Sequence, residues 1–531
     1  MAFKTKFMKK TILERLLDYY QITYEQYLYI TRDVSLNDLP SPFLFKDMDK
    51  AVELVKKHVS LNHKIVIYGD YDADGICGCS ILVKMFKYVN FNANYYIPSR
   101  YLDGYGINEI KAKEIIDKKY DLVITVDNGV AANEPIRILR ESGIDVLVID
   151  HHEAQEILPN ANVIIHPIIS GYSKTISSSG AFTALMFSIA YLGRIDKYLA
   201  TLASISLISD MMPLLEYNRD LLRAVIKNYH YGEFPSIDYL IENDSFNDVS
   251  IGMSIAPKIN AVGRVDKSTN INRLIKYFTS ESKEEIISYK NWILSCNDLR
   301  KEKSKDAKDN IISTMKIHDE AALVIEVELE EGLLGLVANS LMNQFGVPVI
   351  VLTKDSQDPN ILKGSARSIE GFNLAEAFTK LSYLLKTYGG HALAAGLSLE
   401  RDKLDEFKDA FIALVQGTKI VKKKKETIEL NINEVSEETY RLIESFSPFG
   451  EEWKAPLFKL RHIKASTLMY SKNRLNIITS LSFNSRIIGF NYSESMMKEY
   501  DYIDLIGTLR INVFNERKYI EFLVNDIQES K

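Results

Sequence analysis

The chain has 531 residues, of which 46% are hydrophobic and 26% are charged, a composition that is ordinary for a folded globular protein. This length exceeds what one hydrophobic core usually holds, so we expect about three or four domains. The formal net charge of −6 argues against a uniformly basic nucleic-acid-binding coat, although a local basic track remains compatible with it.

Residues 1–60 are expected to form a helical N-terminal extension. Their start is basic, but Glu14, Arg15 and Asp18 interrupt any apolar run there, and no uncharged run in the chain approaches the roughly 18 residues of a membrane span. The three cysteines, Cys77, Cys79 and Cys296, are too few for a disulfide framework and suit a reducing compartment. We therefore expect a cytoplasmic protein without a membrane partner.

Three apolar, strand-like runs come next, and each ends at an aspartate: KIVIYGDYDADG (64–75), DLVITVDNG (121–129) and DVLVIDHH (145–152). Helical patterns separate them, which predicts βαβ units with a parallel sheet over residues 61–272. The carboxyl ends of parallel strands open onto one crevice. The polar residues expected to converge there are Asp72, Asp74, Asp127, Asp150, His151 and His152.

This concentration of carboxylates indicates a metal site, because like charges a few ångströms apart stay ionised together only when cations lie between them. Oxygen ligands with one imidazole favour Mn²⁺ or Mg²⁺ over Ca²⁺. Asp210, at the end of SISLISDMMP, is a plausible further carboxylate. Two such ions suit phosphoryl transfer. The alternative, that these aspartates are turn and helix-cap residues, fits any one of them better than three clusters together.

The sequence after residue 272 predicts a connecting helix and two further domains. Residues 273–316 include a charge-rich segment without proline or glycine, which indicates a connecting helix. Residues 317–420 show a second α/β pattern with the glycine-rich segment GGHALAAGLSLE. Residues 425–531 contain short alternating strands, which favour a small β-barrel of the OB type. Basic and aromatic side chains are interleaved in this last part, as binding of single strands requires.

Several segments are similar to a known family. DYDADG (70–75), VDNG (126–129), DHH (150–152) and SDMMPL (209–214) resemble the four motifs of the DHH phosphoesterase superfamily. RYLDGYG (100–106), KINAVGRVD (258–266), NDLRKEK (297–303), GSARSIEGFNL (364–374), YGGHALAAGL (388–397) and SPFGEEWKAPLF (447–458) narrow the resemblance to the RecJ single-strand exonucleases. The similarity runs in family order from about Ser41 to Asp526.

The resemblance implies a DHH domain, a DHH-associated domain joined to it by a helix, and an OB fold. It implies a metal-dependent 5′→3′ exonuclease that releases mononucleotides from single-stranded DNA in repair and recombination. Two Mn²⁺ or Mg²⁺ ions would be held by Asp72, Asp74, Asp127, His151 and Asp210. His152 and Asp150 would orient the site or assist the leaving group, and Asp70 would lie behind the ligands. A helicase and a single-strand-binding protein are expected partners of a monomer.

The resemblance also assigns residues that contact the substrate. Arg100, Arg264, Ser365 and Arg367 would surround a 5′-terminal phosphate, which arginine forks and glycine-rich turns suit. Gly389, Gly390 and His391 would hold the scissile phosphate. One departure is Glu330 and Glu331, at a position where the family usually has a histidine.

Two alternative functions remain open from the sequence. The first is a DHH phosphodiesterase for short oligonucleotides or cyclic dinucleotides, an enzyme class that normally lacks the OB module. The second is a non-catalytic nucleic-acid-binding relative. The second is disfavoured because every expected ligand position holds a competent residue.

Overall fold

The structure is a computed structural model that describes residues 10–242, 245–265, 268–314, 320–355, 358–420, 426–514 and 517–530. The chain divides into two compact units, one of residues 35–423 and one that joins residues 1–34 to residues 424–531. Each unit is described by itself below.

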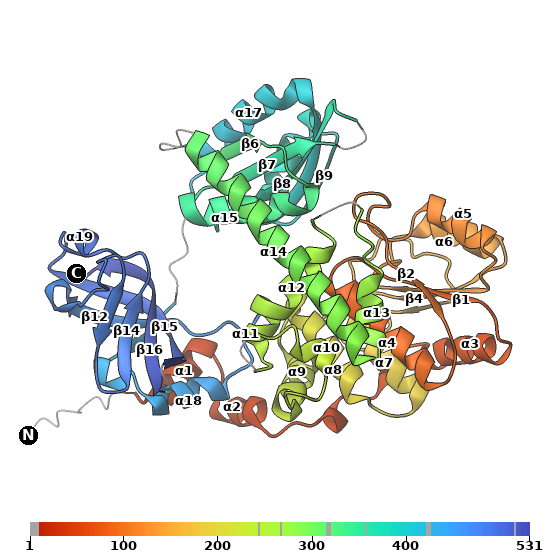
Figure 1. Ribbon diagram of the computed structural model, residues 1–531, viewed down its shortest axis with the longest axis horizontal. Coiled ribbons are helices and arrows are strands. Elements are labelled where there is room, and N and C mark those ends of the chain that lie inside the picture. The colour runs from red at the N-terminus through yellow and green to blue at the C-terminus, as the bar shows by residue number, and fades with distance from the viewer. Residues whose placement is uncertain are drawn as a thin grey trace, which may run out of the picture. The chain divides into compact units, whose positions relative to one another are not determined.

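The first sheet of the larger unit is entirely parallel, with the strand order β2-β1-β3-β4-β5 (Figure 1). Its strands are β1 (Ile65–Tyr68), β2 (Asn94–Tyr96), β3 (Leu122–Val126), β4 (Asp145–Ile149) and β5 (Val163–Ile165). β1 and β3 are buried along their whole length, as their β-branched sequences predict. The register pairs Val126 with Ile149, so that Asp127 and Asp150 come next at one edge of the sheet. The predicted parallel α/β fold is confirmed.

Helices surround this sheet and extend beyond it. They are α3 (Met48–Ser60), α4 (Ala73–Tyr88), α5 (Glu109–Asp117), α6 (Asn133–Glu141), α7 (Gly180–Leu192), α8 (Lys197–Ser209), α9 (Glu216–Asn228), α10 (Pro235–Asp238), α11 (Asp248–Ser250), α12 (Ala256–Val262) and α13 (Arg273–Thr279), with a π-helical turn at Ile251–Ile255. α4 packs against α7 and α8, and all three are apolar around their circumference because they are enclosed. This packing holds the beginnings of α4 and α7 beside the strand ends.

The long helix α14 (Lys283–Thr314) leads into a second sheet with the order β6-β7-β8-β10-β9. Its strands are β6 (Leu323–Glu326), β7 (Val349–Lys354), β8 (Ile361–Arg367), β9 (Thr387–Gly390) and β10 (Ala394–Glu400), and its helices are α15 (Glu331–Phe345), α16 (Leu374–Lys380) and α17 (Leu404–Gln416). α16 and α17 cover one face through Phe378, Phe407 and Phe411. α15 and the end of α14 cover the other face. No described helix is both long and apolar enough to cross a membrane.

The smaller unit is built on a six-stranded sheet with the order β11-β12-β15-β16-β14-β13. Its elements are β11 (Ile428–Leu430), β12 (Phe458–Lys464), β13 (Ile477–Ser480), β14 (Ser485–Gly489), β15 (Tyr502–Phe514), β16 (Arg517–Glu529), α1 (Ile12–Tyr20), α2 (Tyr24–Thr31), α18 (Glu437–Ser445) and α19 (Glu494–Met497). Tyr20 of α1 stacks on Trp453, with 4.4 Å between ring centroids. The residues expected to form one N-terminal extension therefore divide, since α1 and α2 belong to this unit and α3 to the larger one.

Short 3₁₀ segments complete the described secondary structure. They are Leu36–Asp38, Pro42–Leu44, Ser382–Leu384, Arg401–Lys403, Ile432–Glu434 and Ala465–Thr467.

Candidate active site

The loop between β1 and α4 carries Asp70 and Asp72, and Asp74 lies in the first turn of α4. Asp72 caps α4, and its carboxylate accepts the backbone N–H groups of Asp74 at 2.9 Å and Gly75 at 3.2 Å. Gly75 lies directly on the backbone of Asp70, where a Cβ would approach within 2.5 Å. The loop is therefore fixed before any ligand arrives.

The beginning of α7 holds Asp74. Its two carboxylate oxygens accept the backbone N–H groups of Gly180 and Ala181, each at 2.7 Å. These N–H groups have no partner within a helix, and the helix dipole favours a negative charge there. The Asp74 carboxylate is thus oriented by two strong hydrogen bonds in a site where it is 1% exposed.

Asp127 follows β3 with φ of +62°, a left-handed conformation that is uncommon outside glycine. Its backbone N–H donates to the Ile149 carbonyl at 3.0 Å, which ties it to β4. Gly180 lies against it, because a Cβ at that glycine would be 2.7 Å from the Asp127 Cβ. Strained residues of this kind concentrate at functional sites.

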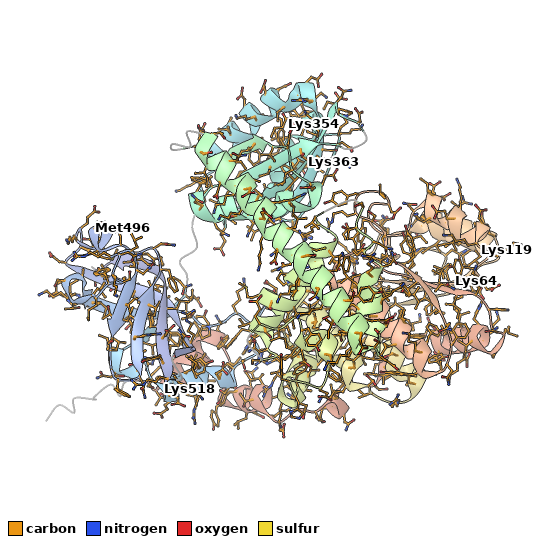
Figure 2. All side chains as sticks on the ribbon, viewed as in Figure 1. Lys64, Lys119, Lys354, Lys363, Met496 and Lys518 are labelled. Carbon is orange, nitrogen blue, oxygen red and sulfur yellow. The ribbon has the colours of Figure 1, made fainter. Side chains whose placement is uncertain are left out.

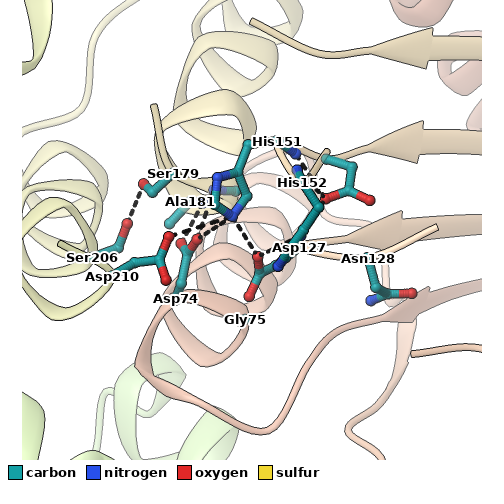
Figure 3. A network of polar contacts seen from close by, with 12 residues as sticks. Asp74, Gly75, Asp127, Asn128, His151, His152, Ser179, Ala181, Ser206 and Asp210 are labelled. Carbon is teal, nitrogen blue, oxygen red and sulfur yellow. Dashed lines mark hydrogen bonds and ion pairs between the residues drawn. The ribbon is translucent and has the colours of Figure 1, made fainter. Parts of the chain in front are cut away.

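His151 joins three elements. Its Nε2 lies 3.1 Å from Asp127 Oδ1, 3.4 Å from Asp74 Oδ2 and 3.5 Å from Asp210 Oδ2 (Figure 3). Three groups of side chains have potential ligand atoms within 4.8 Å of one another: Asp127, His151 and His152; Asp74, His151 and Asp210; and Asp70, Asp72 and Asp127. All five ligands expected from the sequence fall in these groups. Asp127 belongs to the first and third groups, and His151 belongs to the first and second. The structure thus brings them together.

The electrostatics of the cluster match a cation site. Burial, and then the charge of Asp72, raise the pKa of Asp70 to about 8. Burial, and then the charge of Asp74, raise the pKa of Asp210 to about 8, and burial with Asp74 raises that of Asp127 well above its usual value. Among the described residues, buried Asp70 Oδ1 and Asp210 Oδ2 have no hydrogen-bond partner. An oxygen-rich set with one imidazole therefore fits Mn²⁺ or Mg²⁺.

Asp150 has a different environment. Its carboxylate accepts the N–H of Val130 at 2.8 Å and that of His151 at 2.7 Å, and contacts His152 Nδ1 at 2.8 Å. Burial alone would raise the pKa of Asp150, but the His152 contact lowers it to about 2. Conversely, burial opposes protonation of His152, and the Asp150 hydrogen bond raises its pKa to about 9. Asp150 thus positions the turn and keeps His152 charged.

The predicted phosphate-binding residues lie around the beginning of α15. Arg100 stacks over Tyr71 with 4.1 Å to the ring centroid. The Arg264 Nη1 donates to the Gly332 carbonyl at 3.3 Å, and a Cβ at Gly332 would lie 2.8 Å from Arg264 Cα. Arg367 Nη1 donates to Ser365 Oγ at 3.1 Å.

Gly335 lies one turn after Gly332 on α15. Because it has no side chain, Arg367 and Ser365 can lie directly against the helix there. A Cβ there would lie 2.8 Å from Arg367 Nη2 and 3.0 Å from Ser365 Oγ. Burial, and then the charge of Arg100, lower the pKa of Arg264 to about 10. The four residues expected to bind the 5′-phosphate thus gather on one side of the site.

A cavity of about 820 Å³ adjoins this arginine cluster, and Tyr71, Arg100, Tyr105, Ser365 and Gly389 are among its lining residues. Gly390 and His391 continue the exposed β9 edge and do not line the cavity. The structure therefore brings Gly389 to the cavity but not the other two.

Glu330 and Glu331, which depart from the family pattern, are both paired. Lys303 contacts Glu330, and Lys363 (Figure 2) lies 3.2 Å from Glu331.

Sequence reasoning missed three residues that contact the catalytic turns. The Asn260 Oδ1 accepts the Ala73 N–H at 2.8 Å, and the His166 Nε2 donates to the His152 carbonyl at 2.9 Å. The Tyr105 hydroxyl lies 3.0 Å from His152 Nε2 and 3.3 Å from the Asp127 carbonyl. Asn260 and Tyr105 stand inside family motifs, which was the available signal. His166 carries no such signal, since a lone histidine after a strand is common.

Comparison with known proteins agrees with this architecture. Models of the DHH family N-terminal domain, the DHHA1 domain and the RecJ OB domain match residues 64–208, 319–417 and 427–526. The chain is 28% identical to the single-stranded-DNA-specific exonuclease RecJ of Bacillus subtilis, over 94% of this chain and 65% of that protein. The corresponding protein of Haemophilus influenzae is also 28% identical, over 93% of both chains. The chain thus spans about two thirds of the first relative and nearly all of the second.

Solved structures show the same fold. The crystal structure of RecJ from Thermus thermophilus in complex with Mn²⁺ matches with a TM-score of 0.83 at 22% identity, over 98% of this chain and 76% of that one. An exonuclease RecJ bound to manganese matches with a TM-score of 0.62 at 25% identity, over 72% of this chain and 97% of that one. With the OB domain recognised at residues 427–526, the expected order of folds is confirmed. The chain thus carries the DHH, DHHA1 and RecJ OB domains in this order and is similar over most of its length to exonucleases named RecJ.

Proposed function

We propose that this chain is a metal-dependent 5′→3′ exonuclease that hydrolyses the phosphodiester bonds of single-stranded DNA and releases 5′-mononucleotides in DNA repair and recombination. The observation that carries the proposal is the cluster of buried carboxylates around His151 in the same unit as the arginines at α15. Relatives that cover most of the chain are named single-stranded-DNA-specific exonucleases.

Asp72, Asp74, Asp127, His151 and Asp210 are the residues that would hold two Mn²⁺ or Mg²⁺ ions. When bound, such ions lower the pKa of a water molecule and neutralise charge on the departing oxygen. The buried Asp210 Oδ2, which has no hydrogen-bond partner among the described residues, supports this assignment. Asp70 lies behind the ligands and is influenced by the charge of Asp72.

His152 is the residue that carries a proton to the leaving group. Its raised pKa of about 9 keeps the imidazole protonated near neutral pH, while Asp150 fixes its Nδ1. The other nitrogen, Nε2, meets the Tyr105 hydroxyl on the accessible side of the site. Release of a 5′-mononucleotide breaks the bond from phosphorus to the 3′ oxygen, so this oxygen is the atom that needs the proton.

Arg100, Arg264, Ser365 and Arg367 bind the 5′-terminal phosphate in this proposal, which would set the polarity. Gly389, which lines the cavity, would hold the scissile phosphate together with Gly390 and His391, which are exposed at the end of β9 outside the cavity. Each round of hydrolysis leaves a new 5′-phosphate on the shortened strand, so the same pocket serves every cycle. The half-buried arginine cluster, in which the charge of Arg100 lowers the pKa of Arg264, supports this role.

The partners follow from the same proposal. Single-stranded DNA is the substrate, and the RecJ OB domain adds affinity for longer strands. A helicase and a single-strand-binding protein supply the single-stranded DNA. We expect a monomeric, cytoplasmic protein, and the buried thiols of Cys77, Cys79 and Cys296 suit a reducing compartment.

Polarity mapping with end-labelled DNA tests the proposal. We expect a long 5′-phosphorylated single strand to yield labelled mononucleotide at once from a 5′ label, in either Mn²⁺ or Mg²⁺. A 3′ label should appear in mononucleotide only at the end of the reaction. A preference for a dinucleotide over the long strand would contradict the proposal and favour an oligonucleotide phosphodiesterase.

A further inference from the structure

One face of the connecting helix α14 carries polar groups that the proposed mechanism does not use. Asn297, Arg300 and Ser304 stand three and four residues apart and therefore share a face. Asn297 Oδ1, Arg300 Nε and Ser304 Oγ are all buried, and within the described parts of the chain none of these atoms has a hydrogen-bond partner. Buried polar atoms are normally paired, so three in a row on one face need an explanation.

This part of α14 lies beside the beginning of α15. Lys303, one turn after Arg300, contacts Glu330 immediately before α15. α14 packs against both α12 and α15, and Figure 1 shows it running past these two helices. Arg264 follows α12 and lies against Gly332 of α15. Arg300 therefore lies near Arg264, and the charge of Arg300 is one of those that lower the pKa of Arg264. We call the contact region between α12, α14 and the beginning of α15 the seam.

The charges around this seam are unbalanced. In the described residues Arg100, Arg264, Arg300 and Arg367 form no ion pair with a carboxylate, whereas Arg140 of the same unit has Asp145 at 2.7 Å. The nearby Glu330 and Glu331 are already paired with Lys303 and Lys363. Burial lowers the pKa of Arg264 first, the charges of Arg100, Arg300 and Arg367 add to this effect, and the charge of Asp72 opposes it without outweighing them.

A cluster of half-buried guanidinium groups that no carboxylate pairs with directly in the described structure is unfavourable unless an anion joins it. A water molecule can satisfy one of the unpaired atoms but not the excess charge. A phosphate offers several acceptor oxygens that match the guanidinium fork.

We propose that Arg300 is a fourth phosphate-binding arginine, flanked by Asn297 and Ser304, so that the connecting helix α14 is part of the substrate site. The inference rests on the proposed function and names the ligand as a phosphate of the single strand, at the 5′ terminus or in the first phosphodiester. α14 would then contact the same strand that both α/β domains contact.

The test is strand binding by the full chain in EDTA, which prevents hydrolysis, with a 5′-phosphorylated oligothymidylate. Arg300→Met removes the charge and keeps the aliphatic stem, and Arg300→Lys restores a charge. Lys301→Met is the matched control, because Lys301 is exposed on the adjacent side of α14. We expect R300M to raise Kd about tenfold and to reduce the slope of log Kd against log salt by about 0.7, the value for one contact with a single strand. R300K should recover part of the affinity, and K301M should match the wild type.

Stability separates a binding role from a structural one. Because the guanidinium Nε has no partner in the described structure, R300M should melt at the same or a higher temperature than the wild type. The inference would be overturned if R300M melts at a lower temperature and binds more weakly, and if R300K shows the same two losses. Arg300 would then have a structural role.

A 5′-hydroxyl strand distinguishes the two sources of phosphate. A loss limited to the phosphorylated strand places Arg300 at the terminal phosphate, and an equal loss on both strands places it at a phosphodiester. An unchanged Kd and salt slope in R300M, while Arg264→Ala weakens binding, would refute the role of Arg300 and leave the proposed function intact. A wild-type chain that neither binds nor hydrolyses single strands would instead refute the proposed function itself.

Discussion

Asp127 combines burial, a left-handed backbone and contact with His151, and its carboxylate belongs to two of the three candidate ligand groups. We expect Asp127→Asn to reduce hydrolysis by about a thousandfold or more, equivalent to about 4 kcal/mol of activation free energy. Asparagine also tolerates the left-handed conformation, so the fold should remain intact. Initial rates on 5′-phosphorylated strands and calorimetric Mn²⁺ binding measure the effect.

Asp117→Asn is the matched control, because Asp117 is exposed on α5 of the same domain. It should leave the rate and Mn²⁺ binding unchanged. Retention of a tenth of the wild-type rate in D127N would remove Asp127 from the metal site.

The raised pKa values of Asp70 and Asp210, both about 8, predict a pH effect on stability. An unfolded aspartate titrates near about 3.9, so between about pH 4 and pH 8 the folded, metal-free protein binds more protons than the unfolded chain. The free energy of unfolding in EDTA should therefore fall as the pH rises through this window. Mn²⁺ binds the ionised form, so its apparent affinity should rise over the same window.

Thermal melts across the window, with and without Mn²⁺, measure both effects. Asp210→Asn should flatten the slope of the metal-free protein. A metal-free protein that gains stability between about pH 5 and pH 8 would show that these carboxyls are ionised without an ion.

Arg367 donates to Ser365 beside Gly335, within the arginine cluster. We expect Arg367→Ala to weaken binding of 5′-phosphorylated strands about tenfold, or about 1.4 kcal/mol, since the variant cannot form one charge-assisted hydrogen bond. Single-turnover chemistry on bound strand should change less. Competition between phosphorylated and hydroxyl-ended strands is the measurement, and an equal effect on both would place Arg367 outside the terminal pocket.

At the scale of elements, the beginning of α7 fits tightly against the strand ends. The N–H groups of Gly180 and Ala181 hold Asp74, and a Cβ at residue 180 would lie 2.9 Å from the Asp127 Cα. Neither the backbone of α7 at residue 180 nor that of Asp127 can shift to make room without moving the carboxylates of Asp74 and Asp127. We expect Gly180→Ala to lower Mn²⁺ affinity at least about tenfold and to cost about 1–3 kcal/mol of stability through overpacking.

Gly252→Ala is the control for this prediction, because a Cβ there meets only Ile208 at the ordinary distance of 3.4 Å. Calorimetry with Mn²⁺ and thermal melting measure both variants. Wild-type Mn²⁺ affinity in G180A would show that α7 does not position the site.

At the scale of the whole molecule, the OB domain and the first two helices form one unit. Tyr20 stacks on Trp453, and Arg15 pairs with Glu434 at 2.6 Å, so removal of residues 424–531 alone would leave α1 and α2 without these partners. The appropriate truncation is therefore residues 35–423. We expect it to bind long strands more weakly and with a shallower salt slope, by about 0.7 for each phosphate that the OB domain would otherwise neutralise.

Binding of oligothymidylates of increasing length, measured at several salt concentrations, tests this prediction. Hydrolysis of a short oligonucleotide by the truncated chain should stay close to that of the full chain. An unchanged Kd for long strands would remove the OB domain from substrate binding.

The parallel sheet and the convergence of aspartates were predictable because their causes are local. β-branched runs of buried length form strands, and parallel strands place the residues after them at one edge of the sheet. The same reasoning predicted that Asp72, Asp127 and His151, which are far apart in the sequence, lie close together in the fold. Asp210 required more, since it ends a helix, α8, rather than a strand.

The amino-acid sequence by itself determined the order of folds and the residue types that are available to hold a metal ion, because each depends on residue identity and short-range pattern. Only the tertiary structure decided which partner each side chain meets. It joined α1 and α2 to the OB domain, placed the beginning of α7 against Asp74 and left Arg300 without a counter-ion among the described residues. These features depend on packing between segments far apart in the chain, and periodicity along the sequence carries no information about such distances.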